Sequence, residues 1–119
     1  MKIVVIDDLQ FNLDFFEDIL KQEFEVHCFT EPKTAQTFMN LYLPDLVVLD
    51  CVIPGHDGFA TLLQIKKSYP KLPVIMVSGY RLEDNLVKAM DLNIDDFIYK
   101  PIGAEEFIAR IKNKILKSK

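Results

Sequence analysis

Acidic, hydroxyl and amino side chains follow short apolar runs at several places in this chain of 119 residues. Asp7 and Asp8 come directly after "KIVVI", Asp50 closes "LVVLD", Ser78 closes "VIMVS", and Lys100 follows "DFIY". A carboxylate can attack a phosphoryl group, and fixed cations and hydrogen-bond donors stabilise the charge that develops on the phosphoryl oxygens. If these residues lie together, Asp50 is the candidate nucleophile, and Lys100 and Ser78 are the candidate stabilising groups.

The three carboxylates are also a candidate metal site. Two like charges 4 Å apart repel by about 4 kcal/mol at an effective dielectric constant near 20, and a divalent cation removes that conflict. Mg²⁺ prefers oxygen ligands and keeps several waters, and Mn²⁺ can substitute for it. We expect Asp8 and Asp50 to ligate Mg²⁺ directly, Asp7 through water, and the backbone carbonyl of Val52 to add an oxygen. Zinc is a weaker candidate, because neither His nor Cys recurs at ligand spacing.

Segments rich in β-branched residues alternate with amphipathic segments at helical spacing. The predicted strands are Lys2–Ile6, Glu25–Phe29, Asp45–Asp50, Pro73–Ser78 and Asp96–Lys100. The predicted helices are Phe11–Gln22, Glu31–Leu41, a segment that Asp57 caps and that ends near Ser68, Leu82–Leu92, and Ala104–Lys117. This alternation predicts an α/β fold in which helices cover both faces of a parallel sheet.

We expect a flavodoxin-like, doubly wound (βα)5 arrangement with strand order 2-1-3-4-5, because connections between parallel strands are right-handed. The ligand crevice of such a sheet lies beyond the carboxyl ends of its strands. The first and third strands are then central neighbours. Asp7, Asp8 and Asp50 should therefore meet at one edge, with Ser78 and Lys100 beside them.

Length and composition restrict the class of protein. We expect residues 1–119 to form a single domain, with no output domain in this chain. A formal net charge of −4 disfavours direct binding of nucleic acid. No apolar run has the roughly 18 residues that a membrane span needs. Cys28 and Cys51 have no CxxC spacing, which suits packed thiols in a reducing cytoplasm.

The motifs "VVIDD", "DCVIPGHDG", "VSG" and "DFIYKP" together resemble the receiver domain of two-component response regulators. The resemblance implies that Asp50 accepts phosphate from the phosphohistidine of a sensor histidine kinase or a phosphotransfer protein. It also implies that Asp7 and Asp8 are the acidic pair, Lys100 the family's lysine, Ser78 its switch hydroxyl and Phe97 its switch aromatic. Phosphorylation would then repack the surface of the fourth helix, fifth strand and fifth helix.

Within the family, "IDDFIYKP" and "EEFIARI" look most like the regulators with winged-helix DNA-binding output domains. Asp96, Glu106 and Arg110 match charges that such proteins use across a symmetric dimer. Leu86 stands where a basic residue is usual, so the set of ion pairs would be incomplete. A homodimer through this face, when phosphorylated, is one prediction, and control of a separate partner by the same face is another.

Other functions are possible from the residues alone. A phosphate-independent interaction module could use the same fold, although such relatives typically lose an acidic residue or the lysine. A metal-dependent phosphatase with an aspartyl-phosphate intermediate is disfavoured, because Val52 stands where a second acid would follow the nucleophile. An FMN carrier is disfavoured, since the loop after the first strand has no phosphate-binding run. We therefore expect a switch that catalyses only its own phosphorylation and dephosphorylation.

Overall fold

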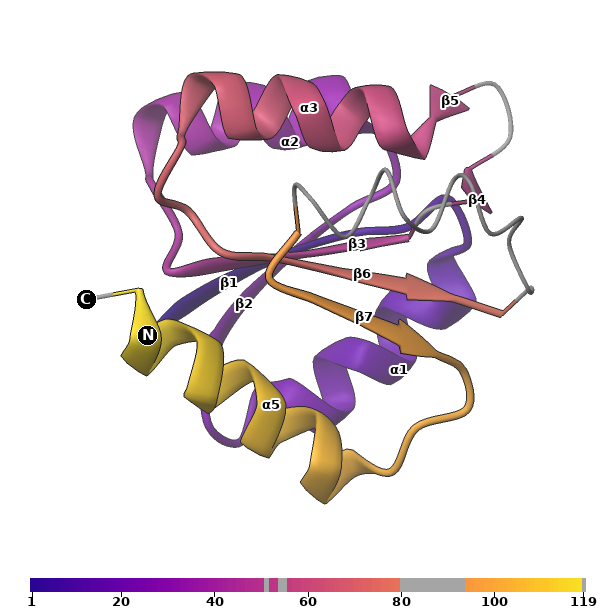
Figure 1. Cartoon of the computed structure of the whole chain (residues 1–119). Helices are drawn as coiled ribbons and strands as arrows, with labels where there is room; N and C mark the ends of the chain where they lie inside the picture. Colours follow the sequence, from indigo (N-terminus) through magenta and orange to yellow (C-terminus); the bar gives the residue numbers. More distant parts are fainter. Residues whose placement is uncertain (51, 54–55, 80–93, 119) are drawn as a thin grey trace.

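The computed structural model describes residues 1–50, 52–53, 56–79 and 94–118. Within them, five parallel strands form one sheet in the order β2-β1-β3-β6-β7 (Figure 1). The strands are β1 (Lys2–Ile6), β2 (Glu25–Phe29), β3 (Leu46–Asp50), β6 (Val74–Ser78) and β7 (Asp96–Tyr99). Because β4 and β5 are short strands outside this sheet, its order is the predicted 2-1-3-4-5, and the flavodoxin-like fold is confirmed.

Helices cover both faces of the sheet. The described helices are α1 (Gln10–Leu20), α2 (Pro32–Leu41), α3 (Gly58–Ser68) and α5 (Ala104–Lys117). Figure 1 shows α1 and α5 on one face and α2 and α3 on the other. The helix predicted for Leu82–Leu92 lies outside the described residues.

The core is divided by the sheet into two layers, because successive side chains of a strand point to opposite faces. Ile3 and Val5 of β1 pack in the layer under α1 and α5, together with Phe16 and Phe107. Val4 and Ile6 pack in the layer under α2 and α3. All five residues of β3 and of β6 are buried. Central strands that are covered on both faces need continuous apolar runs, which is why these runs were recognisable in the sequence.

A short hairpin follows β3 and was not predicted. Val52–Ile53 (β4) pairs antiparallel with His56–Asp57 (β5), directly before α3 begins at Gly58. The hairpin is only two residues long on each side, so it carries none of the alternating pattern by which a strand is recognised. It lies between Asp50 and α3, on the carboxyl side of the sheet.

The structure describes one of the two cysteines, Cys28. Cys28, on β2, is a half-buried free thiol, and burial raises its pKa to about 11. This agrees with the prediction of a packed thiol, while Cys51 lies outside the described residues. Among the residues that the structure describes, no helix has the length and apolar character needed to cross a membrane.

Candidate functional site

Three aspartates meet at the carboxyl edge of the sheet. β1 and β3 are hydrogen-bonded neighbours in which Ile6 is paired with Leu49. The residues that follow, Asp7 and Asp50, are therefore adjacent, and Asp8 lies beside them. One carboxylate oxygen of each of the three aspartates lies within 4.8 Å of the others. The predicted convergence of the three acids is confirmed.

The donor set fits a hard divalent cation. Asp7 is fully buried and Asp50 is 6% exposed, so water screens their mutual repulsion poorly. Carboxylate oxygens at this spacing are suitable ligands for Mg²⁺, which fills its remaining positions with water. Asp7, Asp8 and Asp50 are the residues that would hold the ion. Val52 begins β4 two residues after Asp50, and a ligand role for its carbonyl stays a prediction.

Lys100 brings a positive charge to the same cluster from β7's carboxyl end. Its Nζ is 3.5 Å from Oδ2 of Asp7 and 3.9 Å from Oδ2 of Asp50. The ammonium also lies 5.6 Å from the centroid of the Phe16 ring, on α1. The backbone N–H of Lys100 donates to the carbonyl of Ser78 at 2.7 Å, and the Lys100–Pro101 peptide bond is cis. The sequence predicted Lys100 as a partner of the phosphoryl group, but its shorter contact here is with Asp7.

Asp7 has further partners that sequence reasoning missed. The N–H of Leu9 donates to Oδ1 at 3.1 Å. The side-chain amide of Asn12 donates to Oδ1 at 3.4 Å and to Oδ2 at 3.2 Å. Asn12 lies in the first turn of α1, five residues after Asp7. A polar residue on the otherwise apolar side of a helix was the signal that could have indicated this contact.

Ser78 and Phe97 lie on the two strands beyond β3. Ser78 ends β6, one residue after Val77, which is paired with Asp50. Its side chain is fully buried at the same edge of the sheet. Phe97 is half-buried against the α2–α3 layer of the core, and its ring meets that of Tyr99 edge-to-face, with 4.9 Å between centroids. The switching roles of both residues stay predictions.

The three charged residues that were predicted to act across a dimer, Asp96, Glu106 and Arg110, form ion pairs within this chain. Arg110 on α5 donates to both oxygens of Asp96 on β7, at 2.8 Å from Nε and 2.6 Å from Nη2. Its Nη1 is 3.6 Å from Oε1 of Glu106. The hydrogen bonds to Asp96 raise the pKa of Arg110 above its ordinary value, so the guanidinium stays charged. The sequence placed these three residues on one surface, and the structure adds that they form an intramolecular network.

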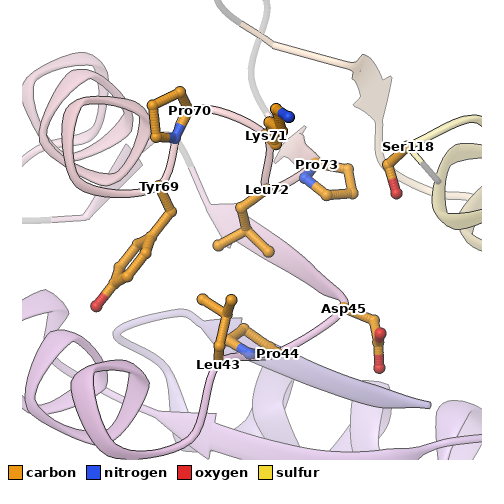
Figure 2. Close-up of a pocket in the computed structure, with 9 residues that line it drawn as sticks. All are labelled: Leu43, Pro44, Asp45, Tyr69, Pro70, Lys71, Leu72, Pro73 and Ser118. Carbon is orange, nitrogen blue, oxygen red and sulfur yellow. The ribbon is translucent and has the colours of Figure 1, made fainter.

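Two hollows differ in their relation to the acidic cluster. One, of about 310 Å³, adjoins it between α1 and the segment after β7, and it is lined by Phe11, Asn12, Phe15, Phe16, Lys100, Pro101 and Ile102. The other, of about 410 Å³, lies at the opposite, amino-terminal edge of the sheet. Figure 2 shows Leu43 and Leu72 pointing toward one another across it. The first hollow therefore lies beside the acidic cluster, next to Lys100, and the second lies away from it.

Comparison with known proteins agrees with this geometry. The profile of the response regulator receiver domain matches residues 3–112. A CheY-like receiver domain protein from Methanospirillum hungatei JF-1 has a TM-score of 0.89 at 25% identity, over 98% of this chain and 94% of that one. The receiver domain of NtrX from Brucella abortus has a TM-score of 0.87 at 33% identity, over 96% of this chain and 98% of that one.

A longer NtrX chain from Brucella abortus, solved with ATP, has a TM-score of 0.90 at 34% identity. The match covers 98% of this chain but 27% of that one, so the chain spans about a quarter of the longer NtrX. Three findings agree: the fold, the acidic cluster with its lysine, and the profile match across nearly all of the sequence. The chain belongs to the response regulator receiver domain family of two-component signalling.

Proposed function

We propose that this chain is a phosphorylation-dependent switch in which Asp50 accepts a phosphoryl group from the phosphohistidine of a sensor histidine kinase or a phosphotransfer protein. The observation that carries the proposal is the position of Asp50. Its carboxylate lies with those of Asp7 and Asp8 in a cluster that could hold a divalent cation, 3.9 Å from the ammonium of Lys100. In the reaction, an Asp50 carboxylate oxygen bonds to phosphorus while the phosphorus–nitrogen bond breaks, and the imidazole nitrogen leaves with the electron pair.

The surrounding residues have separate tasks in this reaction. A bound Mg²⁺ would neutralise charge on the carboxylates and on the phosphoryl oxygens. Lys100 supplies a second positive charge, close enough to pair with a phosphoryl oxygen on Asp50. Ser78 supplies a hydroxyl at the end of the neighbouring strand. Because Val52 stands where an aspartyl-phosphate phosphatase would have a second acid, we infer that the chain turns over no external substrate.

The surface beside the site suits a protein donor. Phe11 is 81% exposed and Phe15 is 52% exposed, and both line the hollow that also contains Lys100. Large exposed apolar side chains next to a reactive centre are typical of protein contact surfaces. A donor that covers these rings would bring its phosphohistidine to Asp50 and exclude water from the reacting atoms.

The output surface of the switch is proposed to involve β7 and α5, and the fourth helix of that prediction lies outside the described residues. Phe97, on β7, is half-buried against the α2–α3 layer of the core, and Asp96, on the same strand, is hydrogen-bonded to Arg110 of α5. Movement of the Ser78 hydroxyl toward a phosphoryl group on Asp50 would let the Phe97 ring turn inward and repack this surface. The occupant would be an output domain, a partner or a second copy of the chain. Any of these occupants would contact Asp96 and Arg110 while the two residues are hydrogen-bonded to one another.

Removal of the metal tests the proposal. Wild-type protein incubated with acetyl phosphate and Mg²⁺ should gain the mass of one phosphoryl group, as measured on the intact protein. Mn²⁺ should support the same gain, and EDTA should prevent it, because the three carboxylates then repel the incoming phosphoryl group. If no gain occurs with either ion while circular dichroism shows a folded protein, the chain is a phosphate-independent module.

Replacement of Lys100 by Met should slow the phosphorylation of Asp50 by acetyl phosphate about 10- to 100-fold at saturating Mg²⁺. Loss of one donor to developing oxyanion charge costs about 10²–10³ in rate in a water-excluded site, and Lys100 is partly exposed, which reduces the effect. The rate of mass gain measures it. Lys112→Met removes a lysine that pairs with Glu23 away from the site, and should react like wild type. Equal rates for both variants would exclude the proposed role of Lys100.

A further inference from the structure

The carboxylate of Asp7 is held by donors of two kinds. Leu9 N–H and the Asn12 side-chain amide are neutral, and the Lys100 ammonium is charged. Asn12 is the only side chain among the described residues that donates to both oxygens of Asp7, at 3.4 and 3.2 Å. Asp7 itself is fully buried, so these contacts determine how its oxygens are directed.

The two kinds of donor respond differently to a cation at the acidic cluster. A divalent ion held by the three aspartates would repel the Lys100 ammonium, and the contact between Lys100 and Asp7 would weaken. A neutral amide is not repelled in this way and can keep its hydrogen bond to a carboxylate that also faces the ion, as donors that surround metal ligands do. Asn12 can therefore hold Asp7 in place while Lys100 turns toward Asp50.

Asn12 is itself held by a backbone hydrogen bond at the start of α1. It lies in the first turn of α1, where its backbone N–H donates to the carbonyl of Leu9 at 3.0 Å. Leu9 in turn donates its own N–H to Asp7. Asp7, Leu9 and Asn12 thus form a closed set of hydrogen bonds that ties the end of β1 to the start of α1.

We propose that Asn12 is a positioning residue of the metal site, which directs the Asp7 carboxylate toward the cation and leaves Lys100 available to Asp50. The proposal rests on the proposed function in one respect, the binding of Mg²⁺ by the three aspartates. It predicts that Asn12 sets the affinity for Mg²⁺ and has little influence on the transfer step once the ion is bound.

The dissociation constant for Mg²⁺ tests this, measured from backbone amide chemical shifts of ¹⁵N-labelled protein. Asn12→Ala should bind Mg²⁺ about tenfold more weakly than wild type, since loss of a hydrogen-bond partner of a metal ligand typically costs 10- to 100-fold in affinity. Asn12→Gln, which retains the amide donor, should stay within about threefold of wild type. Asn113→Ala, an exposed substitution of the same type on α5, should not change the affinity.

Phosphorylation by acetyl phosphate provides a second measurement. For Asn12→Ala, the Mg²⁺ concentration at half-maximal rate should rise about tenfold, while the rate at saturating Mg²⁺ stays within about twofold of wild type. If Asn12→Ala lowers the melting temperature but leaves the Mg²⁺ affinity unchanged, Asn12 is structural and the proposal is overturned. If Asn12→Ala does not fold, Asn12→Ser, whose hydroxyl is too short to reach Asp7, takes its place with the same expected weakening. Failure of the wild type to bind Mg²⁺ would instead refute the proposed function.

Discussion

Asp50→Asn should gain no phosphoryl group under conditions in which acetyl phosphate and Mg²⁺ phosphorylate the wild type completely. The amide of asparagine is far less nucleophilic than a carboxylate and cannot form the acyl phosphate. The substitution also removes one of the three carboxylates that would hold the cation. We expect the rate of phosphorylation to fall at least 1,000-fold, an effect of the size seen when an essential nucleophile is removed. The intact mass, followed over time, measures it.

The result for Asp50→Asn distinguishes Asp50 from the neighbouring aspartates as the phosphate acceptor. Asp7 cannot replace Asp50 as the acceptor, because both of its oxygens are bound by Leu9, Asn12 and Lys100. Asp18→Asn makes the same change of charge on the exposed side of α1 and should leave the mass gain intact. The two variants should have similar circular dichroism. A full mass gain in Asp50→Asn would place the acceptor on Asp8 or elsewhere, and would contradict the assignment of Asp50.

The sequence was sufficient to predict the parts of this fold that depend on local patterns. Each predicted strand agrees with the structure to within one residue at either end, and α5 agrees at both. Buried parallel strands need uninterrupted β-branched and aliphatic residues, so runs such as that of β3 are hard to mistake. Once the strand order was assumed, the meeting of Asp7, Asp8 and Asp50 followed from the rule that parallel strands end at a common edge.

Contacts that depend on the exact approach of two elements were not predictable. The sequence places the polar Asn12 on the apolar side of a helix, but only the distance from α1 to the end of β1 shows that its amide binds Asp7. Asp96 and Arg110 are recognisable as charges on one surface, yet only the packing of α5 against β7 shows that they bind one another. Spacing along the chain gives the face on which a residue lies, whereas these contacts require tertiary distances between side chains.

Phe107→Ala should lower the free energy of unfolding by about 3–5 kcal/mol, the usual cost of removing a fully buried phenylalanine. The side chain of Phe107 is completely buried on α5, and its ring lies 5.5 Å from that of Phe16, centroid to centroid. Single domains are stable by roughly 5–15 kcal/mol, so this loss is a large part of the total. Urea denaturation followed by circular dichroism measures it through the transition midpoint at an unchanged slope.

Two other substitutions serve as controls for the stability of Phe107→Ala. Phe11→Ala removes an 81%-exposed ring from the same chain and should change the stability by less than about 0.5 kcal/mol. Phe107→Leu keeps most of the volume and should lose less than Phe107→Ala. The Phe16 ring contacts both the Phe107 ring and the ammonium of Lys100. A cavity at Phe107 should therefore also loosen the lysine and slow phosphorylation modestly at temperatures where the variant stays folded. Equal stability of Phe107→Ala and Phe11→Ala would mean that α5 does not pack against α1 through these rings.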